Sequence, residues 1–148
     1  MHDRVQIGEQ LKRRKGKGSE FCKYCGKLET LDHLFFNCRI SQLLWVWVRI
    51  SMRWVVRPIS LQHFEEMLGD GEGRITDINE FFILAAVVWA LWKSRNDWVF
   101  NNNLIKSPKA LAYKVVGLLS QWKKMLRPKE VLKMEDTIAK LQEGLKAW

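Results

Sequence analysis

Cysteine is scarce in this chain, and its number argues against a disulfide-stabilised fold. The 148 residues include three cysteines, an odd number that cannot pair completely within one molecule. The N-terminal residues do not resemble a secretory signal peptide. We therefore expect reduced thiols and a nuclear or cytoplasmic location.

An apolar run long enough to cross a membrane is also missing. The run at residues 81–92 ends before two basic residues, Lys93 and Arg95. A transmembrane helix needs about 20 consecutive apolar residues, and this run is clearly shorter. We interpret the run as a buried core helix and expect no membrane partner.

Patterns typical of catalytic sites are missing as well. The glycine-rich stretch at residues 69–73 is not followed by the Lys-Ser/Thr pair of a phosphate-binding loop. No serine lies in a nucleophile-elbow pattern, and neither His2 nor His63 has an evident catalytic partner. The sequence therefore predicts a non-catalytic protein without a small-molecule substrate.

The cysteines that are present form the clearest candidate site. Together with one histidine they follow the spacing C-x2-C-x7-H-x4-C, as Cys22, Cys25, His33 and Cys38. Zn²⁺ in structural sites prefers four thiolate or imidazole ligands in a tetrahedron. Gly26 follows the second cysteine, where a tight turn commonly requires positive φ. A catalytic Cys–His pair is the alternative, but it leaves two cysteines unexplained, so we expect a closed, structural Zn²⁺ site.

Two acidic residues lie between the candidate ligands. Glu29 or Asp32 is placed to accept the second ring proton of His33, as outer-shell carboxylates often do. A role in a turn or at a helix start is the interpretation that we favour for both residues.

Positive charge is the second strong feature. The net charge of +9 and the isoelectric point near 9.7 favour a polyanionic partner. We expect the basic side chains to contact phosphates and the tyrosine to stack on a base. A nuclear import signal and a solvated loop stay open as alternatives for the run at residues 12–17. The candidate nucleic-acid-binding residues are Lys12, Arg13, Arg14, Lys15, Lys17, Lys23, Tyr24 and Lys27.

Helical periodicity dominates the rest of the chain, and no strand pattern is convincing. Asp77 resembles the start of a capping box, and Ser107-Pro108 suits the start of a helix. We expect an all-α fold in which a small helical bundle follows an irregular zinc knuckle. The predicted helices cover residues 41–57, 60–67 and 78–100, with another starting at Pro108 and a last one, after a break at Pro128, that carries Val131 to Leu145. The predicted organisation is a single domain over residues 1–148, with the knuckle at 20–40, helices after the knuckle at 41–68 and the helical part at 77–148.

Helical spacing also predicts the environments of the tryptophans. Four of them recur among apolar residues and are expected in the core: Trp45, Trp54, Trp89 and Trp92. Polar neighbours favour exposure of Trp98 and Trp148. We interpret Arg95 as a donor to carbonyl groups near a helix end.

The knuckle with its flanks resembles the zinc-binding region of reverse transcriptases from non-LTR (LINE-type) retrotransposons, especially those of plants. A downstream stretch, Trp89–Phe100, is similar to the W-x-x-W-x-x-R-N-x-x-x-F sequence that often follows in plant elements. The resemblance covers most of residues 1–100. The matching residues of the knuckle are Cys22-x2-Cys25-Gly26, Glu29-Thr30, Asp32-His33-Leu34-Phe35-Phe36, Cys38 and Trp45.

The resemblance implies a zinc-binding, non-catalytic module that binds RNA or DNA. In such elements the region follows the polymerase, whose paired-aspartate motif is not found here, so we expect an isolated module or a retained fragment. The spacing in this chain differs from that of retroviral zinc knuckles, which have three fewer residues between the second cysteine and the histidine. A fragment that acts as a protein–protein interaction module is the alternative, because residues 43–54 predict a helix that is apolar on most sides. A decayed copy without function is the other alternative.

Overall fold

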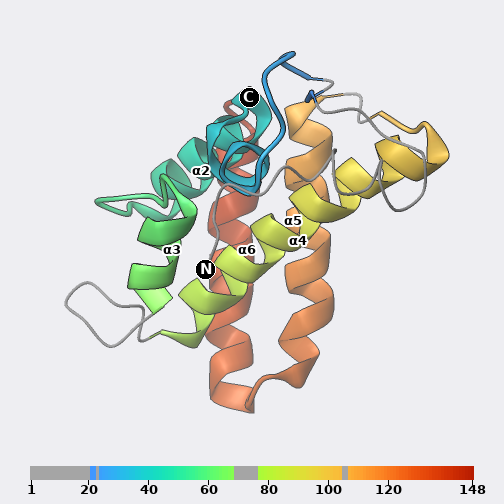
Figure 1. Cartoon of the computed structure of the whole chain (residues 1–148). Helices are drawn as coiled ribbons and strands as arrows, with labels where there is room; N and C mark the ends of the chain where they lie inside the picture. The colour runs from blue at the N-terminus through green and yellow to red at the C-terminus, as the bar shows by residue number, and fades with distance from the viewer. Residues whose placement is uncertain (1–20, 23, 69–76, 105–106) are drawn as a thin grey trace.

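Helices make up the fold, and the knuckle lies at one end of them in the computed structural model (Figure 1). The structure describes residues 21–22, 24–68, 77–104 and 107–148. No strand occurs among these residues, which confirms the predicted all-α class. The elements are the π-helical turn η1 (His33–Asn37), α2 (Arg39–Met52), α3 (Leu61–Leu68), α4 (Ile78–Asn101), α5 (Pro108–Trp122), the 3₁₀ turn η2 (Lys123–Met125) and α6 (Pro128–Leu145).

Capping residues explain most of the helix boundaries. The Asp77 carboxylate accepts a hydrogen bond from the Asn79 N–H at the start of α4, and Ser107 Oγ accepts one from the Ala110 N–H at the start of α5. Asn102 ends α4 in the left-handed conformation with a φ of 54°. These boundaries agree with the sequence predictions.

Helix α2 is shorter than predicted at its C-terminal end. It ends at Met52, and Arg53 follows in the left-handed conformation with a φ of 58°. The Arg53 N–H still bonds to Ile50 O, and the Trp54 N–H bonds to Arg49 O. This left-handed cap ends the helix before the chain reaches Pro58.

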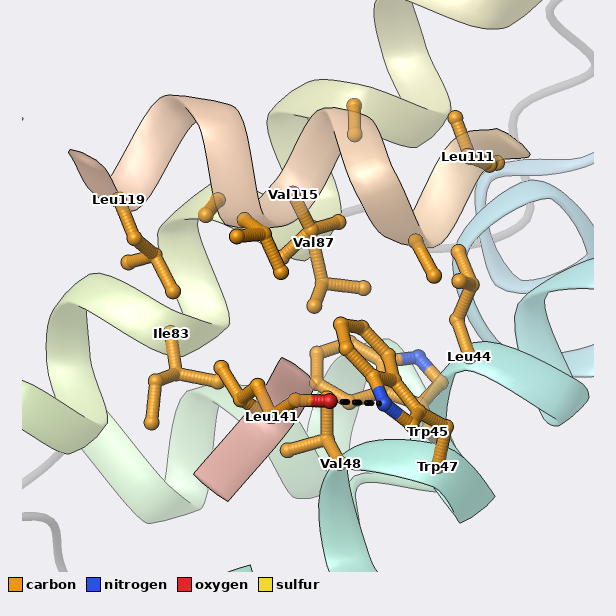
Figure 2. Packing of buried hydrophobic residues seen from close by; sticks show 14 of the residues in the cluster. Leu44, Trp45, Trp47, Val48, Ile83, Val87, Leu111, Val115, Leu119 and Leu141 are labelled. Carbon is orange, nitrogen blue, oxygen red and sulfur yellow. Dashed lines mark hydrogen bonds between the residues drawn. The ribbon is translucent and has the colours of Figure 1, made fainter. Parts of the chain in front are cut away.

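The core lies where α2, α4, α5 and α6 meet. Helices α5 and α6 run side by side as a hairpin, α4 crosses α5 obliquely, and α2 packs against α6 (Figure 1). Figure 2 shows the indole of Trp47 donating a hydrogen bond to Leu141 O, at 3.0 Å. The indole of Trp45 donates to Phe35 O at 2.7 Å. Both indoles are buried with a partner, so α2 is a central helix that joins the knuckle to the bundle.

Tryptophan burial follows the prediction only in part: Trp54 and Trp92, expected in the core, are partly exposed. Trp45 is fully buried as expected, but Trp89 is 47 % exposed. It shares an outer face of α4 with Ile78 and Phe81, because α4 carries apolar residues around most of its surface. Trp148 is exposed as expected, whereas Trp98 is only partly exposed. In the described part of the chain, α4 included, no helix is long and apolar enough to span a membrane.

Candidate metal centre

A tight turn brings the first two cysteines to one side of the knuckle. The Gly26 N–H bonds to Cys22 O at 2.8 Å, and the Cys22 N–H bonds to Lys27 O at 2.7 Å. Gly26 has a φ of 76°, which side chains with a Cβ rarely adopt. The positive φ that the sequence predicted at Gly26 is therefore present, and it closes the turn between the two thiols.

A π-helical turn presents the other two candidate ligands. The Cys38 N–H bonds to His33 O at 2.8 Å, which is the i→i+5 pattern of a π-helix. The start of this turn is capped by Thr30, whose Oγ1 accepts from the His33 N–H at 3.0 Å. The wide turn places His33 and Cys38 on the same side, facing the cysteine turn.

The four side chains converge on one point. Their ligand atoms all lie within 4.8 Å of one another, and three of the four residues are buried. Cys22 Sγ and Cys38 Sγ are 3.8 Å apart. A zinc ion with Zn–S bonds of about 2.3 Å requires tetrahedral S···S edges of about 3.8 Å. The three cysteines and one histidine, and the distance between Cys22 Sγ and Cys38 Sγ, therefore fit Zn²⁺.

One pair in the cluster is closer than a metal would hold it. Cys25 Sγ and His33 Nε2 are 3.0 Å apart, within hydrogen-bond distance for a sulfur. Tetrahedral geometry with the usual bond lengths requires about 3.5 Å between a thiolate and an imidazole ligand. Cys25 is the only half-buried member of the cluster, so it has room to move outward by this small amount.

The two buried thiols differ in the direction in which their pKa is shifted. The hydrogen bond to Cys38, together with burial, raises the pKa of the Cys22 thiol to about 12. The same hydrogen bond lowers the pKa of Cys38. Metal ligation requires thiolates, so binding of Zn²⁺ must release the proton that Cys22 holds.

The two acidic residues near the ligands have other partners than the histidine. Glu29 Oε1 accepts hydrogen bonds from Arg95 Nε at 2.9 Å and from Arg95 Nη2 at 2.6 Å. Asp32 Oδ1 accepts from the Leu61 N–H at the start of α3, which agrees with the favoured helix-start role. The interpretation of Arg95 as a carbonyl donor is wrong: its guanidinium bonds to the Glu29 carboxylate and lies 5.9 Å from the Trp92 ring.

A small cavity separates the cluster from α4. Its volume is about 20 Å³, and both Cys22 and Cys38 line it together with side chains of α4 and α5. Three buried polar atoms here have no protein partner: Tyr24 Oη, Ser94 Oγ and Arg95 Nη1. The sequence analysis missed Ser94 and the buried Arg95–Glu29 pair. A basic residue inside the apolar pattern of α4 was the available signal, since a buried charge requires a partner.

The predicted nucleic-acid-binding residues fall into two groups. Lys27 is exposed and Tyr24 is half-buried, and both line a shallow hollow beside Cys25 that also includes Asn37, Arg39 and Gln42. Among the described residues, neither Lys27 nor Arg39 has an ion-pair partner. The others lie outside the described residues: Lys12, Arg13, Arg14, Lys15, Lys17 and Lys23.

Comparison with known families agrees with the metal assignment. A family model described as zinc-binding in reverse transcriptase matches residues 1–45, which include all four members of the cluster. No curated protein and no solved structure matches the chain. The family match and the Cys₃His cluster together indicate Zn²⁺ as the metal. The match identifies a zinc-binding region related to reverse transcriptase and no catalytic domain.

Proposed function

We propose that this chain is a zinc-stabilised, non-catalytic module that binds RNA or DNA and derives from a LINE-type reverse transcriptase of the plant type. The convergence of Cys22, Cys25, His33 and Cys38 is the observation that carries the proposal. The family match over residues 1–45 supports the relation to reverse transcriptase. The more specific assignment to LINE-type elements is supported by the sequence resemblance of the knuckle and of Trp89–Phe100.

The proposed role of the cluster is structural. Four protein ligands fill a tetrahedral zinc site and leave no position for water, so Zn²⁺ there supplies folding energy and no hydrolytic chemistry. Phe36 of η1 reaches the core, whereas no described residue of the turn from Cys22 to Cys25 belongs to the core cluster. Holding both turns through one set of ligands fixes the knuckle against α2 and α4.

Charge supports a polyanionic partner. The net charge is +9, and the exposed Lys27 and Arg39 have no acidic partner among the described residues. The sequence adds five basic residues at positions 12–17, directly before the knuckle. Nucleic acids offer a dense row of phosphates to such a surface, and binding releases counterions.

Titration at two salt concentrations tests the proposal. Labelled RNA and DNA are titrated with the wild type and with a variant in which Lys12, Arg13, Arg14 and Lys15 are alanine. We expect weaker binding of the variant to all sequences and a flatter salt dependence, by about 0.7 to 0.9 in the log–log slope per lost phosphate contact. A wild type that binds neither nucleic acid at low salt would contradict the proposal.

A protein–protein interaction module is the second candidate, and one observation favours it. Ile78, Phe81 and Trp89 recur on one outer face of α4 and are 42 %, 48 % and 47 % exposed. Large exposed apolar side chains grouped on one helix face favour a partner site. A protein–protein interaction module becomes the preferred function if the wild type fails to bind nucleic acid.

A further inference from the structure

Helix α5 has an exposed face that is basic, and the sequence around it is almost free of acidic residues. Between Glu80 and Glu130 the chain has nine lysines and arginines and a single acidic residue, Asp97. Helix α5 itself contains no acidic residue. Lys114 and Lys124 are exposed, and among the described residues neither has an ion-pair partner.

These two lysines belong to one stripe. The buried face of α5 packs on the core through Leu111, Val115 and Leu119 (Figure 2). At 100° per residue the opposite face is centred on Gly117. The exposed residues around this centre are Tyr113, Lys114 and Gln121, and the exposed Lys124 follows in the 3₁₀ turn η2 directly after α5. The ten residue steps from Lys114 to Lys124, eight in α5 and two in η2, place the two Cα atoms about 15 Å apart.

Gly117 has no structural reason to be glycine. It lies in the middle of α5, where glycine is less favourable than alanine. A Cβ at this position would meet no atom within 4 Å. By contrast, a Cβ at Gly144 would lie 2.0 Å from Ser51 Oγ, so that glycine is required by the close approach of α2 and α6. A glycine that packing does not require, at the centre of a basic face, fits a surface that another backbone approaches closely.

We propose that this face of α5 binds the phosphate backbone of a duplex nucleic acid, with Lys114 and Lys124 contacting phosphates on either side of Gly117. The separation of about 15 Å is comparable to the width of the B-DNA major groove, about 12 Å, whose two edges carry phosphates. The inference rests on the proposed nucleic-acid binding but concerns residues other than those at positions 12–27.

A pair of matched double variants tests the lysines. Lys114→Ala/Lys124→Ala removes two charges from the proposed surface, and Lys140→Ala/Lys146→Ala removes two from α6, where each lysine already pairs with a neighbouring acidic residue. Duplex DNA, duplex RNA and single strands of one sequence are titrated at several salt concentrations. We expect the first variant to lower the log–log salt slope for duplexes by about 1.8, from two lost contacts, and the second to leave it unchanged. Equal slopes for the two variants would overturn the inference.

Two substitutions at Gly117 test the close approach. Gly117→Ala is expected to raise the melting temperature by a few degrees, and Gly117→Gln to keep the fold, since the site is open. We expect Gly117→Gln to weaken duplex binding at least tenfold while its helical circular dichroism stays that of the wild type. Unchanged duplex binding by Gly117→Gln would overturn the close approach.

The outcomes separate this inference from the proposed function. A wild type that binds no nucleic acid contradicts both. A wild type that binds duplexes, while Lys114→Ala/Lys124→Ala binds them equally well, contradicts the α5 surface alone. Displacement of duplex DNA by phosphatidylserine vesicles, with loss of vesicle binding in the same variant, would assign the face to a membrane surface and overturn the inference.

Discussion

Arg95 and Glu29 form a buried ion pair that joins α4 to the zinc knuckle. The guanidinium donates to one carboxylate oxygen through Nε and Nη2, at 2.9 and 2.6 Å, and the side chains are 2 % and 4 % exposed. The two residues are 66 positions apart in the sequence. Buried charges of this kind are costly when unpaired, so each residue depends on the other.

A double-mutant cycle tests this dependence. Arg95→Met and Glu29→Gln each leave one buried charge without the opposite charge that compensates it, and we expect each to lower the free energy of unfolding by about 3 kcal/mol. The double variant should lose clearly less than the sum, which chemical denaturation of zinc-loaded protein will measure. The exposed pair Lys140–Asp136 is the control, where we expect less than about 1 kcal/mol. Additive losses for Arg95 and Glu29 would contradict the coupling.

Zinc ligation is the next prediction. His33→Ala or Cys38→Ser removes one of the four converging ligands, and we expect purified protein to lose its zinc. His63→Ala is the matched control, because His63 lies outside the cluster and bonds to the Ile59 N–H. Elemental analysis of protein prepared without chelator gives the zinc content. Zinc-free wild type would contradict the assignment, as would a full complement of zinc in both ligand variants.

The helical bundle should stay folded when removal of the metal unfolds the knuckle. The core between α4, α5 and α6 contains none of the four ligands, and Trp47 ties α2 to α6 independently of them. We therefore expect chelator-treated protein to keep most of its helical circular dichroism at 222 nm, while cysteines 22, 25 and 38 become reactive to thiol reagents. One cooperative loss of all helical signal on adding chelator would show that the bundle depends on the metal.

Local signals in the sequence predicted much of this fold. Asp77, Ser107 and Pro108 define helix starts through their own hydrogen bonds and ring geometry, and the cysteine spacing identified the cluster before its geometry was known. Three features depended on tertiary structure. Arg53 ends α2 in the left-handed conformation although it is not a glycine. Trp89 is exposed because α4 is apolar on most sides, and periodicity alone does not show which side faces solvent. Glu29 and Arg95 come into contact only in the folded protein.

The charged residues at the start of α4 should make the free energy of unfolding depend on pH in the acid range. Burial alone raises the pKa of Asp77, but hydrogen bonds from Lys133 Nζ at 2.5 Å and from the Asn79 N–H outweigh burial and lower it below the usual 3.8. A carboxylate whose pKa is lowered by folding stabilises the folded protein at pH values above its unfolded-state pKa. This contribution is lost as the pH falls through the folded-state pKa. Burial, followed by the Asp77 charge, raises the pKa of the neighbouring Glu80, which gives a dependence of opposite sign just above its usual 4.5.

Asp77→Asn isolates this contribution, because asparagine keeps the N-cap and removes the charge. We expect the wild type to lose more unfolding free energy than Asp77→Asn between about pH 5 and about pH 2, and the two proteins to converge at the acid end. Lys133→Gln should reduce the same pH dependence, since it removes the partner that lowers the pKa of Asp77. Urea denaturation at each pH measures the three profiles. Parallel profiles for the wild type and Asp77→Asn would show that the carboxylate contributes nothing through its charge, despite the short contact with Lys133.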